Sequence, residues 1–268
     1  MDLKNPQELQ NHIMGTYFGL RVGLVAIGIA LPLVVLFAGG VLHHVWLESS
    51  ISQYYHTQGL SYLTTRDFFV GSLFAVGACL YLYKGFSTKE NVALNLAGVF
   101  ALLVALLPTA APLTDRTIIS TLHGTSAVLF FLCIAYVSLF RSRDTIHLLP
   151  LAKQGRYEWA YFLAGLAMIA SPLAAVVLSF ALDRTSLTFW AEACGVWTFA
   201  AYWIIKTREM RETKAEKRAL DAKLKRDAVL EADVASPIDA GRTASARDLS
   251  SQSGKREAIV PVAAEESY

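Results

Sequence analysis

A polar stretch with several kinds of chemically active side chains lies between the first two long apolar segments of the chain. Residues 48–67 hold carboxylate, hydroxyl, phenol, imidazole and guanidinium groups. Acid and imidazole groups together suit two kinds of chemistry, the binding of a divalent metal and the transfer of protons. We therefore take this stretch as the centre of a candidate site.

Three ionisable residues in the following segments extend the candidate site. Asp67 opens the second apolar segment, while His123 and Glu192 lie about two turns inside the fourth and the sixth. A charged side chain facing lipid at that depth costs about 3 kcal/mol, so each should face the interior of a helical bundle. All three lie toward the same end as residues 48–67, which predicts one shared pocket. Its candidate catalytic residues are Glu48, Ser52, His56, Asp67, His123 and Glu192.

The spacing of His44, Glu48 and Ser52 predicts one shared helix face if the first helix continues past Trp46. A metal hypothesis follows, with zinc as the candidate cofactor. Its candidate ligands are His44, His56, Asp67 and His123.

Simpler roles remain open for each of these side chains. His43 and His44 are typical of histidines at a membrane interface. Arg66 and Asp67 could form an ion pair at the start of a helix, where an acid suits the helix dipole. For His123 and Glu192 the alternative is a structural hydrogen bond inside the bundle.

The composition explains why helices in a membrane should position these groups. Hydrophobic residues make up 54% of the chain and charged residues only 17%, which a soluble domain rarely shows. Several apolar stretches reach about 20 residues, the length of a membrane-spanning helix. We expect an all-α, integral membrane six-helix bundle with the lipid bilayer as its partner, and no nucleic acid. The expected spans are 22–42, 68–83, 92–107, 117–140, 159–182 and 187–205.

Lysine and arginine in the short connections predict the orientation, because they accumulate on the cytoplasmic side. The connections 84–90 and 141–158 are richer in these residues than 43–67, 108–116 and 183–186. We therefore expect both termini in the cytoplasm and residues 48–67 outside a cell inner membrane. The expected parts are an N-terminal segment 1–21, the bundle 22–205, a basic helical extension 206–235 and a disordered tail 236–268.

The polar stretch also carries a resemblance to known proteins. Ser-Ile-Ser-Gln-Tyr-Tyr-His-Thr at 50–57, followed by Arg-Asp-Phe-Phe-Val-Gly-Ser-Leu at 66–73, resembles uncharacterised bacterial multi-pass membrane proteins. That family implies no activity. Glu48, Ser52 and His56 are also similar to part of the zinc site of alkaline ceramidases. The chain departs from that family in having six expected spans rather than seven and no HxxxH motif in the last one.

Three function classes follow. The first is a membrane protein with an outward-facing polar pocket and an unassigned binding, sensing or scaffolding role. The second is a metal-assisted hydrolase acting on a lipid or lipid-like amide. The third is a small-solute or proton-coupled transporter, which would also need polar residues at the inner end, where only Asn91 and Asn95 stand out. The sequence does not indicate an oligomeric state.

Overall fold

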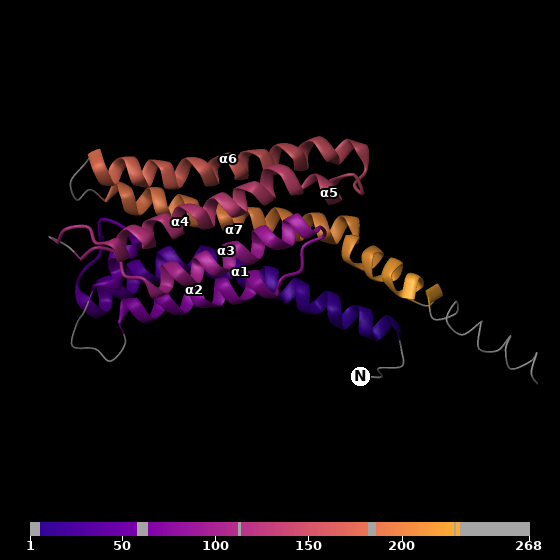
Figure 1. The fold of residues 1–268 in the computed structure, drawn as a ribbon, viewed down its shortest axis with the longest axis horizontal. Helices are drawn as coiled ribbons and strands as arrows, with labels where there is room; N and C mark the ends of the chain where they lie inside the picture. The colour runs from indigo at the N-terminus through magenta and orange to yellow at the C-terminus, as the bar shows by residue number, and fades with distance from the viewer. Residues whose placement is uncertain (1–5, 58–63, 112–113, 182–185, 228, 231–268) are drawn as a thin grey trace, which may run out of the picture. The chain divides into compact units, whose positions relative to one another are not determined.

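The computed structural model describes residues 6–57, 64–111, 114–181, 186–227 and 229–230. The described part of the chain is helical and contains no strand, which confirms the all-α fold class. The chain forms two units, Met1–Glu216 and Lys217–Tyr268, and the first contains every helix labelled in Figure 1. The expected tail at 236–268 lies outside the described residues. The elements are α1 (Pro6–His43), the 3₁₀-helix η1 (Ile51–Tyr55), α2 (Thr65–Leu82), α3 (Thr88–Leu106), α4 (Ile118–Tyr136), the π-helix η2 (Val137–Arg141), α5 (Arg143–Ile146), α6 (Leu151–Ala181) and α7 (Leu187–Thr213).

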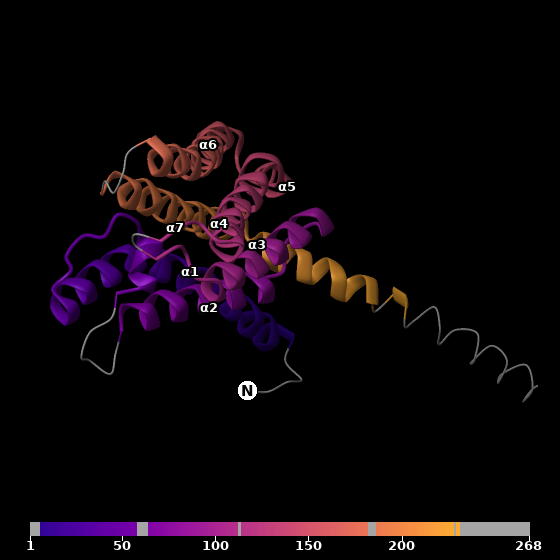
Figure 2. The same cartoon turned by 60° about the vertical axis from the view of Figure 1, so that its left-hand side comes forward.

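The six long helices pack in chain order and close a ring. Contacts join α1 to α2, α2 to α3, α3 to α4, α4 to α6 and α6 to α7, and α7 returns to α1. Successive helices are antiparallel, as Figures 1 and 2 show, and the short connections after α2 and α6 favour this arrangement. The helix ends therefore gather in two places. We call them the η1 end, which also holds the start of α2, α4 and α7, and the α5 end, which also holds the start of α1, α3 and α6.

Small residues let neighbouring helices approach closely. A Cβ atom built on Gly98 of α3 would lie 2.8 Å from the carbonyl oxygen of Gly77 on α2. Ala97 and Ala101, on the same side of α3, are almost fully buried. Such small-residue faces bring helix backbones together where no hydrophobic effect drives them, as in lipid.

Five helical segments are long and apolar enough to cross a membrane. They are Gln7–His43, Thr65–Leu82, Thr88–Leu106, Ile118–Ile146 and Leu151–Leu178. Large apolar side chains such as Phe37, Phe140 and Phe180 are more than half exposed on their outer faces. This pattern is typical of a membrane protein. Helix α7 does not meet the same criterion, because Glu192 and amphipathic aromatic residues such as Trp190 and Tyr202 lower its hydropathy.

The ends of the bundle differ from the expected boundaries. Helix α1 begins at Pro6, so most of the expected N-terminal segment 1–21 belongs to the first helix. Helix α7 continues past Ile205 to Thr213, and Lys206, Glu209 and Thr213 are buried. Residues 206–213 are therefore part of the packed bundle, and the prediction of a basic extension beginning at 206 was wrong for them. Residues 215–227 are also helical.

Candidate functional site

The short helix η1 closes the η1 end of the bundle. Ser50 begins it with extended backbone, and its hydroxyl accepts a hydrogen bond from the Gln53 amide at 3.2 Å. Ile51 and Tyr54 are buried beneath it, with exposed fractions of 3% and 0%. Because η1 contacts α1, α2 and α7, these two side chains pack into an apolar cluster with side chains of those helices.

His123 forms the most specific polar contact at this end. Its Nδ1 lies 2.7 Å from the carbonyl oxygen of Leu107, and its Nε2 lies 3.0 Å from Ser52 Oγ. A carbonyl can only accept, so Nδ1 carries the proton and Nε2 accepts the Ser52 hydroxyl proton. This is the arrangement of a nucleophile next to a general base whose ring is held by a third group. The side chain of His123 is only 3% exposed.

Glu192 reaches the same short helix from α7. Its Oε2 accepts a hydrogen bond of 2.7 Å from the Ile51 amide, the first backbone donor of η1. A carboxylate at a helix start satisfies donors that the helix itself leaves unpaired. The structure therefore brings Glu192, Ser52 and His123 together around η1. Glu192 and His123 hold successive residues of η1, Ile51 and Ser52.

Glu48 and His56 lie on either side of η1 and make separate contacts. Thr57 donates to Glu48 Oε1 at 3.3 Å, and His56 Nε2 lies 2.7 Å from the Thr109 carbonyl. Gln53 also donates to a carbonyl of the connection after α3, that of Ala110, at 2.9 Å. These contacts fasten the connection after α3 to the η1 segment.

His44 and Asp67 do not belong to this arrangement. Helix α1 ends at His43, and His44 adopts left-handed backbone with φ 58°, so the predicted helix face through His44, Glu48 and Ser52 was wrong. Asp67 accepts bonds from the Thr64 amide and hydroxyl, at 2.9 and 3.1 Å, in a capping box at the exposed start of α2.

The predicted pairing of Arg66 with Asp67 is not what the structure shows. The Arg66 guanidinium lies 4.3 Å from the centre of the Tyr55 ring, a cation–π contact.

The metal hypothesis finds no ligand set in the described part of the chain. No group of three or more histidine, cysteine, aspartate or glutamate side chains there could hold an ion. Of the candidate ligands, His44 is exposed, His56 is turned to a carbonyl, Asp67 caps a helix and His123 is occupied on both nitrogens. The residues present do not fit a zinc centre.

The α5 end contains a buried ionic cluster. Lys206 and Glu209, both on α7, have exposed fractions of 2% and 0%. Lys206 Nζ donates to Glu209 Oε2 at 3.2 Å and to Thr145 Oγ1 at 2.9 Å. Tyr161 donates its phenol hydrogen to the same Glu209 oxygen. The other oxygen, Oε1, is buried and has no hydrogen-bond partner among the described residues.

Glu90 adds a second buried carboxylate to this end. It is 1% exposed, its Oε2 accepts from the Phe86 amide at 2.8 Å, and it interacts electrostatically with Lys206. Lys206 also lies 5.5 Å from the centre of the Phe86 ring. We call Glu90, Thr145, Tyr161, Lys206 and Glu209 the α5-end cluster.

A further ion pair lies beside this cluster. Arg21 is 2% exposed, forms an ion pair with Glu216 and donates to the Tyr83 hydroxyl at 3.4 Å. The ring of Tyr83 packs edge-on against that of Trp203, with 5.0 Å between ring centres. Arg21 and Glu216 balance each other's charge, so this pair leaves the charge of the α5-end cluster unchanged.

Sequence reasoning missed the α5-end cluster. It ended the last span at Ile205, because the apolar run stops there, and took Lys206 as the first residue of an exposed extension. A usable signal was present in the spacing of Phe199, Tyr202, Lys206 and Glu209, which recur on one face of α7. A buried aromatic face that continues directly into Lys and Glu indicates charges that are buried with it.

Comparison with protein-family models, with curated proteins and with solved structures found no match for this chain.

Proposed function

We propose that this chain is a six-span integral membrane protein that couples the movement of a small solute to the movement of a proton. The α5-end cluster faces the cytoplasm of a cell inner membrane, and the η1 end faces outward. The observation that carries the proposal is Glu209, which is fully buried, is paired through one oxygen and finds no partner for the other among the described residues.

Burial makes these charges expensive to maintain. A buried ion pair seldom stabilises a fold more than apolar side chains of the same size would. Ionisable groups inside membrane bundles instead mark ion pathways and proton relays. The α5-end cluster contains three such groups on two helices, Glu90 on α3 and Lys206 and Glu209 on α7. A role in proton binding explains why these three charged side chains occupy the core of the bundle.

The charge balance of the cluster supports binding of one proton. Glu90 and Glu209 contribute two carboxylates, and Lys206 contributes one ammonium group. Asp144 also interacts with Glu90, but its charge is balanced by its ion pair with Arg141. A single proton on one carboxylate makes the cluster neutral, and its loss leaves a buried negative charge. A cationic solute that reaches Glu209 Oε1 can replace that proton, because it restores the charge balance, and the binding of the solute is then coupled to the release of the proton.

The opposite end supports a closed state in such a cycle. Ile51 and Tyr54 are buried at the η1 end, and Glu192 and His123 hold η1 in place. Between the two ends, Phe131, Phe199 and other buried side chains fill the core. Transport would require the η1 segment to release these hydrogen bonds and open this end.

Proteoliposomes with a pH-sensitive dye inside test this proposal. A panel of small cations, amino acids and organic acids is added outside, and the internal pH is followed. We expect at least one solute class to change the internal pH with wild-type protein and not with Glu209→Gln. Glu212→Gln is the matched control, because Glu212 lies one turn further on α7 in a partly exposed pair with Lys153. The proposal fails if no solute moves protons or if Glu209→Gln behaves like wild type.

A second candidate function is hydrolysis of a lipid or lipid-like ester or amide, and the Ser52–His123 hydrogen bond favours it. In this function Ser52 is the nucleophile, and His123 Nε2, which accepts its proton, is the general base. A fluorophosphonate probe should label wild-type protein in lipid nanodiscs, and Ser52→Ala and His123→Ala should abolish labelling. Ser50→Ala, on the neighbouring cap residue, should keep it. Absence of labelling of the folded wild-type protein would exclude this function.

A further inference from the structure

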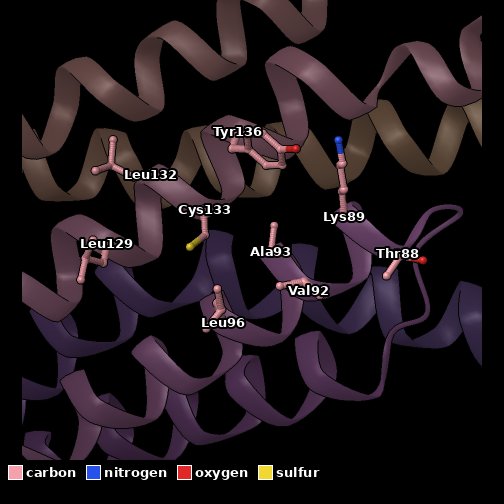
Figure 3. A pocket seen from close by; sticks show the side chains of 9 residues that line it. All are labelled: Thr88, Lys89, Val92, Ala93, Leu96, Leu129, Leu132, Cys133 and Tyr136. Atoms are coloured by element: carbon pink, nitrogen blue, oxygen red, sulfur yellow. The ribbon is translucent and has the colours of Figure 1, made fainter.

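A groove runs between α3 and α4 on the outer side of the ring, toward the α5 end. Its volume is about 470 Å³, within the range of roughly 300–1,000 Å³ typical of ligand sites. The lining is almost entirely apolar along its length, with Val92 and Leu96 from α3 facing Leu129 and Leu132 from α4. Figure 3 shows these side chains along the two helices.

The most polar groups of the lining lie at one end of this groove, and the Tyr136 hydroxyl points toward that end in Figure 3. Thr88 and Lys89, at the start of α3, lie at the end opposite to Leu129 and Leu132 in Figure 3. Lys89 is exposed and takes part in none of the ion pairs formed between described residues. The adjacent acid, Glu90, is buried and accepts from the Phe86 amide, so it does not offset the charge of Lys89 at the surface.

We propose that this groove binds one acyl chain of an anionic phospholipid whose headgroup phosphate contacts Lys89. The proposal rests on the membrane spans and orientation proposed above, and it is independent of transport. The groove lies on the face that the spans expose to lipid, so a hydrocarbon chain can enter from the side.

The distribution of polarity along the groove fits a phospholipid. From Thr88 to Leu96 the groove follows α3 for about 12 Å, at 1.5 Å per residue. The ammonium group lies at the helix start, where the proposed orientation places the cytoplasmic headgroup region, and the apolar lining continues toward the middle of the membrane. Basic pockets between membrane helices on the cytoplasmic side suit anionic headgroups in this way. A zwitterionic headgroup carries its own cationic group, which would lie near the Lys89 ammonium. Its electrostatic attraction to Lys89 would therefore be weaker than that of an anionic headgroup.

Native mass spectrometry of protein released from mixed vesicles tests the proposal. The vesicles contain equal amounts of phosphatidylglycerol, which is anionic, and phosphatidylcholine, which is zwitterionic, with matched acyl chains. We expect wild-type protein to retain phosphatidylglycerol in preference to phosphatidylcholine. Lys89→Glu should reduce that preference by about fivefold or more, the factor that one basic side chain near an anionic surface is worth. Val92→Trp, which fills the groove, should remove retention of both lipids.

Two matched variants control for charge and for bulk. Lys84→Glu changes an exposed lysine of the connection just before α3 that does not line the groove, and it should keep the wild-type preference. Val177→Trp places the same bulk on an exposed position of α6 and should keep retention. Equal retention of the two lipids by wild type, or equal effects of the two lysine variants, would overturn the headgroup assignment. Retention unchanged in Val92→Trp would overturn the groove as the binding site.

Discussion

Lys206 and Glu209 form an ion pair in the interior of the bundle, with 3.2 Å between Nζ and Oε2 and neither side chain exposed to more than 2%. The two residues lie one turn apart on α7, so the helix itself sets their separation. Thr145 and Tyr161, from α5 and α6, complete the contacts of the pair. The pair therefore joins three helices at the α5 end.

Removing one partner of this pair should destabilise the protein strongly. Lys206→Met leaves the Glu209 carboxylate buried without its counterion, at an expected cost of about 3–5 kcal/mol. The double variant Lys206→Met, Glu209→Gln should cost less than the sum of the two single changes, because it removes both charges. The free energies of unfolding of the two single variants and the double variant, measured in detergent micelles, test both expectations.

The exposed pair of Lys153 and Glu212 at the same end provides the control cycle. Its side chains are 52% and 36% exposed, so removing either partner should have little effect. The coupling free energy of the Lys206–Glu209 double-mutant cycle should be the larger one. Equal coupling free energies for this pair and for the Lys153–Glu212 pair would contradict the burial of Lys206 and Glu209.

Hydrophobicity predicted the six long helices, because the backbone polar groups of each apolar run must hydrogen-bond within a helix. It did not predict their ends or the short elements η1, η2 and α5. Thr117, expected to begin the fourth helix, is the N-cap of α4, whereas the predicted turn at 84–90 ends earlier, because α3 already begins at Thr88. Membrane crossing by α7 and the orientation of the ends stay predictions.

The polar contacts could not be predicted from the sequence in the same way. Ser52 and His123 are 71 residues apart, and Ile51 and Glu192 are 141 apart, so their pairing depends on how the ring closes. Lys206 presents a different difficulty, since composition does not separate a buried lysine from an exposed one, and only its spacing from Phe199 and Tyr202 indicates burial. Composition placed it in a solvated extension, whereas the packing of α7 places it in the core.

The η1 segment should loosen when its polar contacts are removed. His123→Ala breaks the bonds to Ser52 and to the Leu107 carbonyl and leaves this half-buried carbonyl without its donor, at an expected cost of about 2 kcal/mol. Ser52→Ala should cost less, about 1 kcal/mol, because it removes one bond. Glu192→Gln combined with His123→Ala should be non-additive, because both side chains hold η1. Thermal unfolding in detergent measures all three.

A hydroxyl on the same helix gives the control for the η1 prediction. Thr125→Ala removes an exposed hydroxyl that bonds only to its own helix, at the Thr121 carbonyl, and it should leave stability nearly unchanged. If His123→Ala is as mild as Thr125→Ala, His123 does not hold η1 in place.

Close packing of α2 against α3 predicts different outcomes for two glycine substitutions. Gly98→Ala places a Cβ atom 2.8 Å from the Gly77 carbonyl oxygen, so the helices must separate, at an expected cost of about 1–3 kcal/mol. Gly71→Ala, on α2, meets no atom within 4 Å and should stabilise the helix by up to about 1 kcal/mol. Unfolding of the two variants in the same detergent compares them directly. Similar effects of both changes would show that α2 and α3 do not approach at Gly98.

The proposed topology makes a prediction that also tests whether α7 crosses the membrane. The connections 84–90 and 141–158 are the richer in lysine and arginine, so the α5 end should be cytoplasmic. A reporter that is active only in the cytoplasm should therefore be active when fused after Glu216 and silent when inserted at 57–63 or at 183–186. Activity at 57–63 together with silence after Glu216 would reverse the orientation. Equal activity at 183–186 and after Glu216 would place both ends of α7 on one side of the membrane. The six-span bundle would then have only five spans, and the α5-end cluster could not lie across the membrane from η1, so the transport proposal would fail with it.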